Sequence, residues 1–155
     1  MNDPALTLEF WRQIGLAAVC GAAIGLERQL RGKAMGVRTG LLICVATSMF
    51  ASMGAAVVGT QGDPTRMIGQ IAVGIGFLGG GAIINQGTTV HGLTSAAIIW
   101  LLAAIGSMVG LGLIWTPLLV TTALLLLIVA LDQLERRIPW LSRGDHAPPD
   151  RPKDG

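Results

Sequence analysis

The sequence predicts an all-α integral membrane protein, a bundle of about five transmembrane helices with Gly-rich packing. Of its 155 residues, 52% are hydrophobic and only 13% are charged, whereas soluble domains carry about 25% charged residues. No Asp, Glu, Lys or Arg stands between Met67 and Leu131. A small soluble domain leaves much of its surface in water, so it cannot hide so long an uncharged stretch, whereas a lipid bilayer can.

Five segments are long and apolar enough, or nearly so, to cross the hydrocarbon core, which takes roughly 20 residues. These predicted spans cover residues 8–26, 40–59, 67–84, 93–109 and 113–131. The run from Leu93 to Leu131 is about twice the length of one span, so it must fold back on itself. Gly110, Gly112 and Pro117 mark the joint, which makes the fourth and fifth helices antiparallel neighbours.

The remaining segments complete the predicted organisation. The membrane domain covers residues 1–140, and residues 141–155, rich in Pro, Asp and Gly, are expected to form a disordered cytoplasmic tail. Basic residues follow the first span and the fifth span, namely Arg28, Arg31, Lys33 and Arg38, and then Arg136 and Arg137. Five spans place both groups on one side, which the positive-inside rule assigns to the cytoplasm, with the N-terminus outside.

Several classes of function are disfavoured. The formal net charge of +2 is too small to indicate a nucleic-acid partner. The sequence lacks the H-E-x-x-H, G-x-S-x-G and P-loop motifs, so we predict a protein that is not an enzyme and binds no cofactor. Cys20 and Cys44 lie in apolar runs and are expected to pack as small hydrophobic residues. His91 has no second ligand at a useful spacing, so no metal site is predicted.

Glycines recur at a spacing of four within the predicted spans. Small residues allow helix backbones to approach closely in lipid, either within one chain or between copies. The predicted packing glycines are Gly21, Gly25, Gly74, Gly76, Gly79 and Gly80. Three of them form G-x-G-x-x-G, but the strand and the acidic residue that a dinucleotide site requires are missing. A glycine-faced third helix, broken or kinked near Gly79 to Gly81, explains the pattern better.

Polar residues inside or beside membrane helices tend to face the bundle interior or a cavity. The candidate functional positions are Glu27, Arg28, Arg38, Thr39, Asp63, Arg66, Gln70, Asn85 and Thr94. Glu27 and Arg28 either fix the depth of the first helix or form part of a polar cluster. In that cluster Glu27 pairs with Arg38, and Thr39 caps the second helix.

The other polar positions have their own interpretations. Asp63 before Pro64 predicts the N-cap and first position of the third helix, and Asp63 can also pair with Arg12 or Arg66. Arg66, Gln70 and Gly74 share one helix face, which could line an outward-facing polar cleft. Asn85 belongs to a connection expected to be a solvated loop, and Thr94 is expected to cap the fourth helix.

These groups coincide with stretches that resemble the MgtC/SapB family of bacterial inner-membrane proteins. The matching stretches are GAAIGLERQ (21–29), GVRT (36–39), DPTRMIGQIAVGIGFLGGGAII (63–84) and GLTSAAIIW (92–100). The resemblance implies a multi-pass inner-membrane bundle linked to magnesium homeostasis. Longer members carry a soluble C-terminal domain, and this chain departs from them as an expected short form without it. Some members are described as inhibitors of the membrane sector of the ATP synthase.

Two functions follow as expectations. The first is a non-enzymatic regulator of magnesium homeostasis or of the ATP synthase. It would act through helix–helix docking on a second copy, as in a dimer, or on another membrane protein such as the ATP synthase membrane sector. The alternative is a small transporter or channel for Mg²⁺ or another solute. Mg²⁺ prefers oxygen ligands, and the carboxylates Glu9, Glu27 and Asp63 all lie near predicted membrane boundaries, which favours the regulator.

Overall fold

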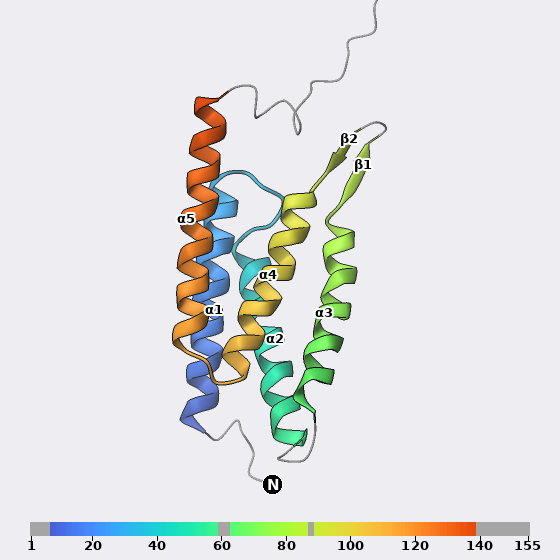
Figure 1. Cartoon of the computed structure of the whole chain (residues 1–155), viewed down its shortest axis with the longest axis vertical. Helices are drawn as coiled ribbons and strands as arrows, with labels where there is room; N and C mark the ends of the chain where they lie inside the picture. The colour runs from blue at the N-terminus through green and yellow to red at the C-terminus, as the bar shows by residue number, and fades with distance from the viewer. Residues whose placement is uncertain (1–6, 59–62, 87–88, 139–155) are drawn as a thin grey trace, which may run out of the picture.

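The computed structural model describes residues 7–58, 63–86 and 89–138, and within these it contains five helices. They are α1 (Leu8–Leu30), α2 (Val37–Val58), α3 (Pro64–Gly81), α4 (Leu93–Gly110) and α5 (Trp115–Arg137). Successive helices run in opposite directions along the long axis of the bundle (Figure 1). The predicted helical membrane bundle is therefore confirmed, while the predicted tail over residues 141–155 lies outside the described residues.

One end of the bundle gathers the basic connections. The segment between α1 and α2, the turn between α3 and α4 and the end of α5 all lie at this end, which we call the basic end (Figure 1). The start of α1 and the joint between α4 and α5 lie at the other end. The two groups of basic residues thus share one end, as a chain with five crossings requires.

Three helices satisfy the length and hydropathy of a membrane span within the described residues. These stretches are Val37–Val57, Leu93–Gly110 and Trp115–Leu134. Only 11% of the apolar stretch of α5 is buried inside the bundle, whereas 56% of the apolar stretch of α4 is buried. Side chains such as Leu119 and Leu126 are more than two-thirds exposed on α5, at 69% and 67%. Apolar side chains left in this state are accounted for by contact with lipid.

The core lies where α1, α2 and α4 cross. Its fully buried members include Ala17, Cys20, Cys44, Leu102 and Ile105. Both cysteines are free thiols in this core, as their apolar surroundings predicted. α5 covers α1 and α4 from one side, and α3 packs mainly on α4 at the other side and less extensively on α2.

The connection between α3 and α4 differs from the predicted solvated loop. Strands β1 (Ile84–Gln86) and β2 (Thr89–His91) pair antiparallel, with Ile84 opposite His91. The helix before it is continuous from Pro64 to Gly81, so of the two alternatives, a break or a kink near Gly79 to Gly81, the break is absent and the glycines there end the helix. Gly92 joins the hairpin to α4 at φ +90°, and a side chain there would collide with the carbonyl of Ala82. Only glycine both adopts this positive φ readily and leaves room for the carbonyl of Ala82.

Candidate functional site

A buried arginine lies at the basic end of the first helix. Arg28 is only 4% exposed, and its Nη2 donates a hydrogen bond of 2.6 Å to Ser95 Oγ in the first turn of α4. Its Nε has no hydrogen-bond partner within the described residues. A guanidinium buried so deeply in a membrane helix is costly unless the bundle or a ligand compensates it. The structure therefore assigns Arg28 to the bundle interior and not to a depth-setting position at the interface.

Glu27 pairs with a different arginine from the one predicted. Its carboxylate forms an ion pair with Arg31, one helical turn later, and Arg31 in turn pairs with Asp132 of α5. Arg38 is exposed in the first turn of α2 and forms no ion pair within the described residues. Arg31 follows Glu27 by four residues, so the helical backbone alone brings the two side chains together. Glu27 therefore pairs with Arg31 and not with the distant Arg38.

The start of α2 is capped by a side chain that the sequence analysis did not select. Gln29 Oε1 accepts a hydrogen bond of 3.1 Å from the backbone N–H of Val37, the first residue of the helix. Thr39 lies inside the helix, so its predicted role as the cap is wrong. Thr94 is likewise not an N-cap, because α4 begins at Leu93 and its capping position, Gly92, offers no side chain.

Asp63 caps α3, as the sequence predicted. Its Oδ1 accepts hydrogen bonds from Thr65 N at 2.9 Å and from Thr65 Oγ1 at 2.5 Å. These two bonds, chiefly the one from the hydroxyl, hold the pKa of Asp63 below its ordinary value, and the positive charge of Arg66 adds to them. Asp63 forms no ion pair with Arg12 or Arg66 in the part of the chain that the structure describes, so neither predicted pairing is present.

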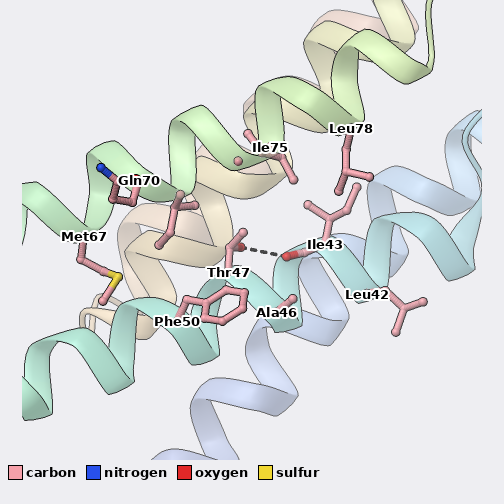
Figure 2. A pocket seen from close by; sticks show the side chains of 11 residues that line it. Leu42, Ile43, Ala46, Thr47, Phe50, Met67, Gln70, Ile75 and Leu78 are labelled. Atoms are coloured by element: carbon pink, nitrogen blue, oxygen red, sulfur yellow. Dashed lines mark hydrogen bonds between the residues drawn. The ribbon is translucent and has the colours of Figure 1, made fainter.

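A groove runs between α2 and α3. It has a volume of about 560 Å³ and is lined almost entirely by apolar side chains, with Gln70 and Thr47 as its polar residues (Figure 2). Gln70 and Gly74 lie in its wall as their shared face predicted, whereas the exposed Arg66 does not line it. The predicted polar cleft is therefore an apolar groove, because Ile71 and Ile75 turn toward α2 beside Gln70.

A second pocket, of about 330 Å³, lies nearer the basic end. Its hydroxyl groups come from Thr39 of α2 and from Ser95 of α4, which also binds Arg28. The remaining lining residues are apolar or small, namely Ala34, Met35, Phe77, Leu78, Gly81, Ala82 and Ile99. Leu78 lines both cavities, so the pocket and the groove follow one another along α2 and α3.

The predicted packing glycines divide into two sets. A Cβ on Gly25 would lie 2.7 Å from Gly36 O, and one on Gly21 would meet the carbonyl of Gly40, so α1 and α2 touch through their backbones. Gly106 and Gly110 bring α4 equally close to α2. Close approaches at these glycines, to Gly36 and Gly40 for α1 and to Cys44 and Ser48 for α4, build the centre of the bundle within a single chain.

The glycines of α3 behave differently. A Cβ on Gly79 would meet Ala96 of α4 at an ordinary 3.5 Å, and a Cβ on Gly74, Gly76 or Gly80 would have no neighbour within 4 Å. Gly76 and Gly80 lie on an exposed face with Gly69, Val73 and Phe77, which we call the outer face of α3. Of the two predicted alternatives, packing within the chain is not seen at Gly76 and Gly80, and packing between chains stays a prediction.

Two further points of the sequence analysis concern Asn85 and metal ligands. Asn85 lies in β1, and its side chain lies outside what the structure describes. Among the described residues there is no group of three or more His, Cys, Asp or Glu side chains that could hold a metal ion.

Comparison with known proteins finds relatives of this chain in several bacteria. The family model described as "MgtC family" matches residues 14–137. The protein named "Putative magnesium transporter YhiD" of Escherichia coli (strain K12) is 37% identical over 140 residues, which are 86% of this chain and 65% of YhiD. Protein MgtC of Brucella abortus (strain 2308) is 40% identical over 111 residues, 67% of this chain and 46% of that protein.

Protein MgtC of Salmonella typhimurium (strain 14028s / SGSC 2262) is 34% identical over 141 residues, 91% of this chain and 60% of that protein. The chain thus spans less than two-thirds of the length of each of these relatives. No solved structure matches it. Since the family match extends from within α1 to the end of α5 and the helices are apolar enough for a bilayer, the chain is a membrane protein that belongs to the MgtC family.

Proposed function

We propose that this protein is a non-enzymatic regulator linked to magnesium homeostasis, and that it acts by docking the outer face of α3 against a transmembrane helix of another protein. The partner is another membrane protein, such as the membrane sector of the ATP synthase, or a second copy of the chain. The protein lies in the bacterial inner membrane with its basic end in the cytoplasm, in accordance with the positive-inside rule.

The single observation that carries the proposal is the contrast between the glycines. Neighbouring backbone fills the space beside Gly21 and Gly25 of α1 and beside the glycines of α4, whereas a Cβ added to Gly76 or Gly80 of α3 would have no neighbour within 4 Å. Phe77 and Val73 beside them are 85% and 73% exposed. A small-residue pair at spacing four, flanked by large apolar side chains, is a surface on which a second helix packs closely in lipid.

The experiment is co-purification of the tagged full chain from bacterial membranes. Gly76→Leu places a bulky side chain on the outer face, so it is expected to abolish recovery of the ATP synthase membrane sector or of a second, differently tagged copy. Gly74→Leu is the matched control, since Gly74 lies on the same helix, has equal free space, and faces the groove instead. Equal recovery of partners with both variants would remove the basis of the proposal.

Transport of Mg²⁺ or another solute is the second candidate, and the name of the YhiD relative favours it. Gln70 and Thr47 are the polar groups that such a path would find in the α2–α3 groove. Purified protein in liposomes should then move Mg²⁺, and Gln70→Leu should reduce the flux. Liposomes that hold the folded protein and show no flux would eliminate this candidate.

A further inference from the structure

The groove and the pocket share Leu78 and follow one another along α2 and α3; we call the two together the cavity. Apart from Gln70 and Thr47, the groove is apolar from Phe50 and Met67 to Leu42, as Figure 2 shows, and the pocket beyond Leu78 contains Thr39 and Ser95. The polar part lies at the basic end, and the apolar part extends toward the middle of the bundle. This order, polar at the surface and apolar below, is that of a phospholipid in one leaflet.

The length of the cavity agrees with this order. Thr39 in the pocket and Phe50 at the far end of the groove lie eleven positions apart in α2. At a rise of about 1.5 Å per residue this distance is roughly 16 Å. The hydrocarbon core of a bilayer is about 30 Å thick, so the cavity reaches through about one leaflet.

The polar end offers what a phosphate group requires. Ser95 Oγ accepts its hydrogen bond from Arg28, so its own proton is available for a ligand in the pocket, and Thr39 adds a second hydroxyl. Arg28 lies behind Ser95 as a guanidinium nine-tenths or more buried, with its Nε unpartnered within the described residues. Among the described side chains of this end, the cations Arg28, Arg31, Lys33, Arg38 and Arg137 outnumber the carboxylates Glu27 and Asp132.

We propose that the cavity is a binding site for one anionic phospholipid. The phosphate lies in the pocket against the hydroxyls of Thr39 and Ser95, with Arg28 supplying positive charge through Ser95. An acyl chain lies in the groove beside Gly74, where the absence of a side chain leaves the room. Phe77 borders both the pocket and the outer face of α3, but the two hydroxyls and the groove that hold the lipid belong to other residues, so the site does not depend on the docking function proposed above. Basic pockets between helices at the membrane surface hold anionic head groups in this manner.

Native mass spectrometry of the detergent-solubilised full chain tests the site, with dioleoyl phosphatidylglycerol as the anionic probe and dioleoyl phosphatidylcholine as the zwitterionic one. Phosphatidylglycerol is expected to bind about tenfold more tightly, because both lipids carry the phosphate but the choline group of phosphatidylcholine adds a positive charge, which the buried Arg28 repels. Inorganic phosphate at equal concentration should not displace it, because phosphate has no acyl chain to occupy the groove. Displacement by phosphate would identify a free-anion site and overturn the proposal.

Two pairs of variants locate the lipid. Gly74→Leu fills the groove and should weaken binding of both lipids at least tenfold, whereas Gly76→Leu on the outer face should leave binding unchanged. Thr39→Val should weaken binding of both lipids, because the phosphate that its hydroxyl contacts is common to them, and Arg12→Gln, which removes an exposed cation at the opposite end of α1, should leave binding unchanged. Thr39 and Arg12 are both exposed, so these variants are expected to fold. Unchanged binding in Gly74→Leu, or equal loss in Arg12→Gln and Thr39→Val, would show an unspecific lipid shell and refute the site.

Discussion

At the scale of single residues, the same amino acid has opposite roles in different helices. Gly21 and Gly25 of α1 are required because neighbouring backbone occupies the space a side chain would need, whereas the glycines on the outer face of α3 face nothing within the chain. Arg28 and Arg31 are three residues apart in sequence, and yet one bonds a neighbouring helix from the interior while the other forms ion pairs near the surface. Residue type alone does not separate these roles.

Gly25→Ala should destabilise the protein by about 1–3 kcal/mol, since the added Cβ would lie 2.7 Å from both Gly36 O and Val37 Cα and would force α1 and α2 apart. Gly76→Ala is the control with open space around the new methyl group, and it should be neutral or stabilising by about 0.5–1 kcal/mol, because alanine favours the helix. Thermal unfolding in detergent micelles measures both. Equal melting temperatures for the two variants would contradict the close α1–α2 contact.

The capping carboxylate of Asp63 makes the stability of α3 depend on pH. Its pKa in the folded protein lies below the ordinary value of 3.8 because of the two bonds from Thr65. Its stabilising contribution is therefore complete above that ordinary value and is lost as the pH falls through the lower, folded-state pKa. Asp63→Asn retains a capping oxygen without the titration. The melting temperature of the native protein should fall relative to the variant only below about pH 4, and parallel pH profiles would refute this account.

At the scale of helices, the bundle has a tight centre and two loosely held members. α1, α2 and α4 interlock through glycine backbone contacts and share the buried core. The groove lies between α3 and α2. α5 lies on the outside of the bundle, and little of its apolar stretch is buried. The peripheral helices are consequently the ones with surface available for lipid or for partners.

The ion pair between Arg31 and Asp132 helps to fix α5 on α1. Asp132→Asn should weaken this attachment by about 1 kcal/mol or less, since both side chains are partly exposed to solvent and water screens the pair. Hydrogen exchange followed by mass spectrometry should then show faster exchange in the last turns of α5 and no change in α4. Glu9→Gln, which removes a carboxylate at the opposite end of α1, serves as the control. Equal exchange in both variants would show that apolar packing alone holds α5.

At the scale of the whole molecule, five alternating helices bring the basic connections to one end (Figure 1). Positive charge stays on the cytoplasmic side during insertion because moving it across the bilayer is costly. The native cysteines Cys20 and Cys44 are buried, so they contribute little to surface labelling.

Lys33→Cys and Arg66→Cys therefore test the orientation. Lys33 is exposed at the basic end and Arg66 is exposed in the first turn of α3, at the opposite end. A membrane-impermeant maleimide should label the cysteine at position 66 in intact spheroplasts and the one at position 33 only in inside-out vesicles. The reverse pattern would invert the proposed topology.

The sequence by itself determined the class of structure. A charge-free run from Met67 to Leu131 excludes a soluble core, and the placement of basic residues requires an odd number of crossings. Asp63 and Pro64 determined the start of α3, because an N-cap depends only on residues adjacent in the chain. Four short stretches, at 21–29, 36–39, 63–84 and 92–100, together indicated the family that the comparisons then showed.

Only the tertiary structure decided which polar and small residues meet across helices. The pairing of Arg28 with Ser95 joins residues 67 positions apart, and no local pattern specifies it. The groove beside Gly74 exists because α3 packs on α4 rather than fully on α2, a choice made by how the surfaces of three helices fit together. Local propensity and hydropathy act over a few residues, whereas backbone contact between helices depends on the rotation and crossing of both partners, which a single sequence pattern does not encode.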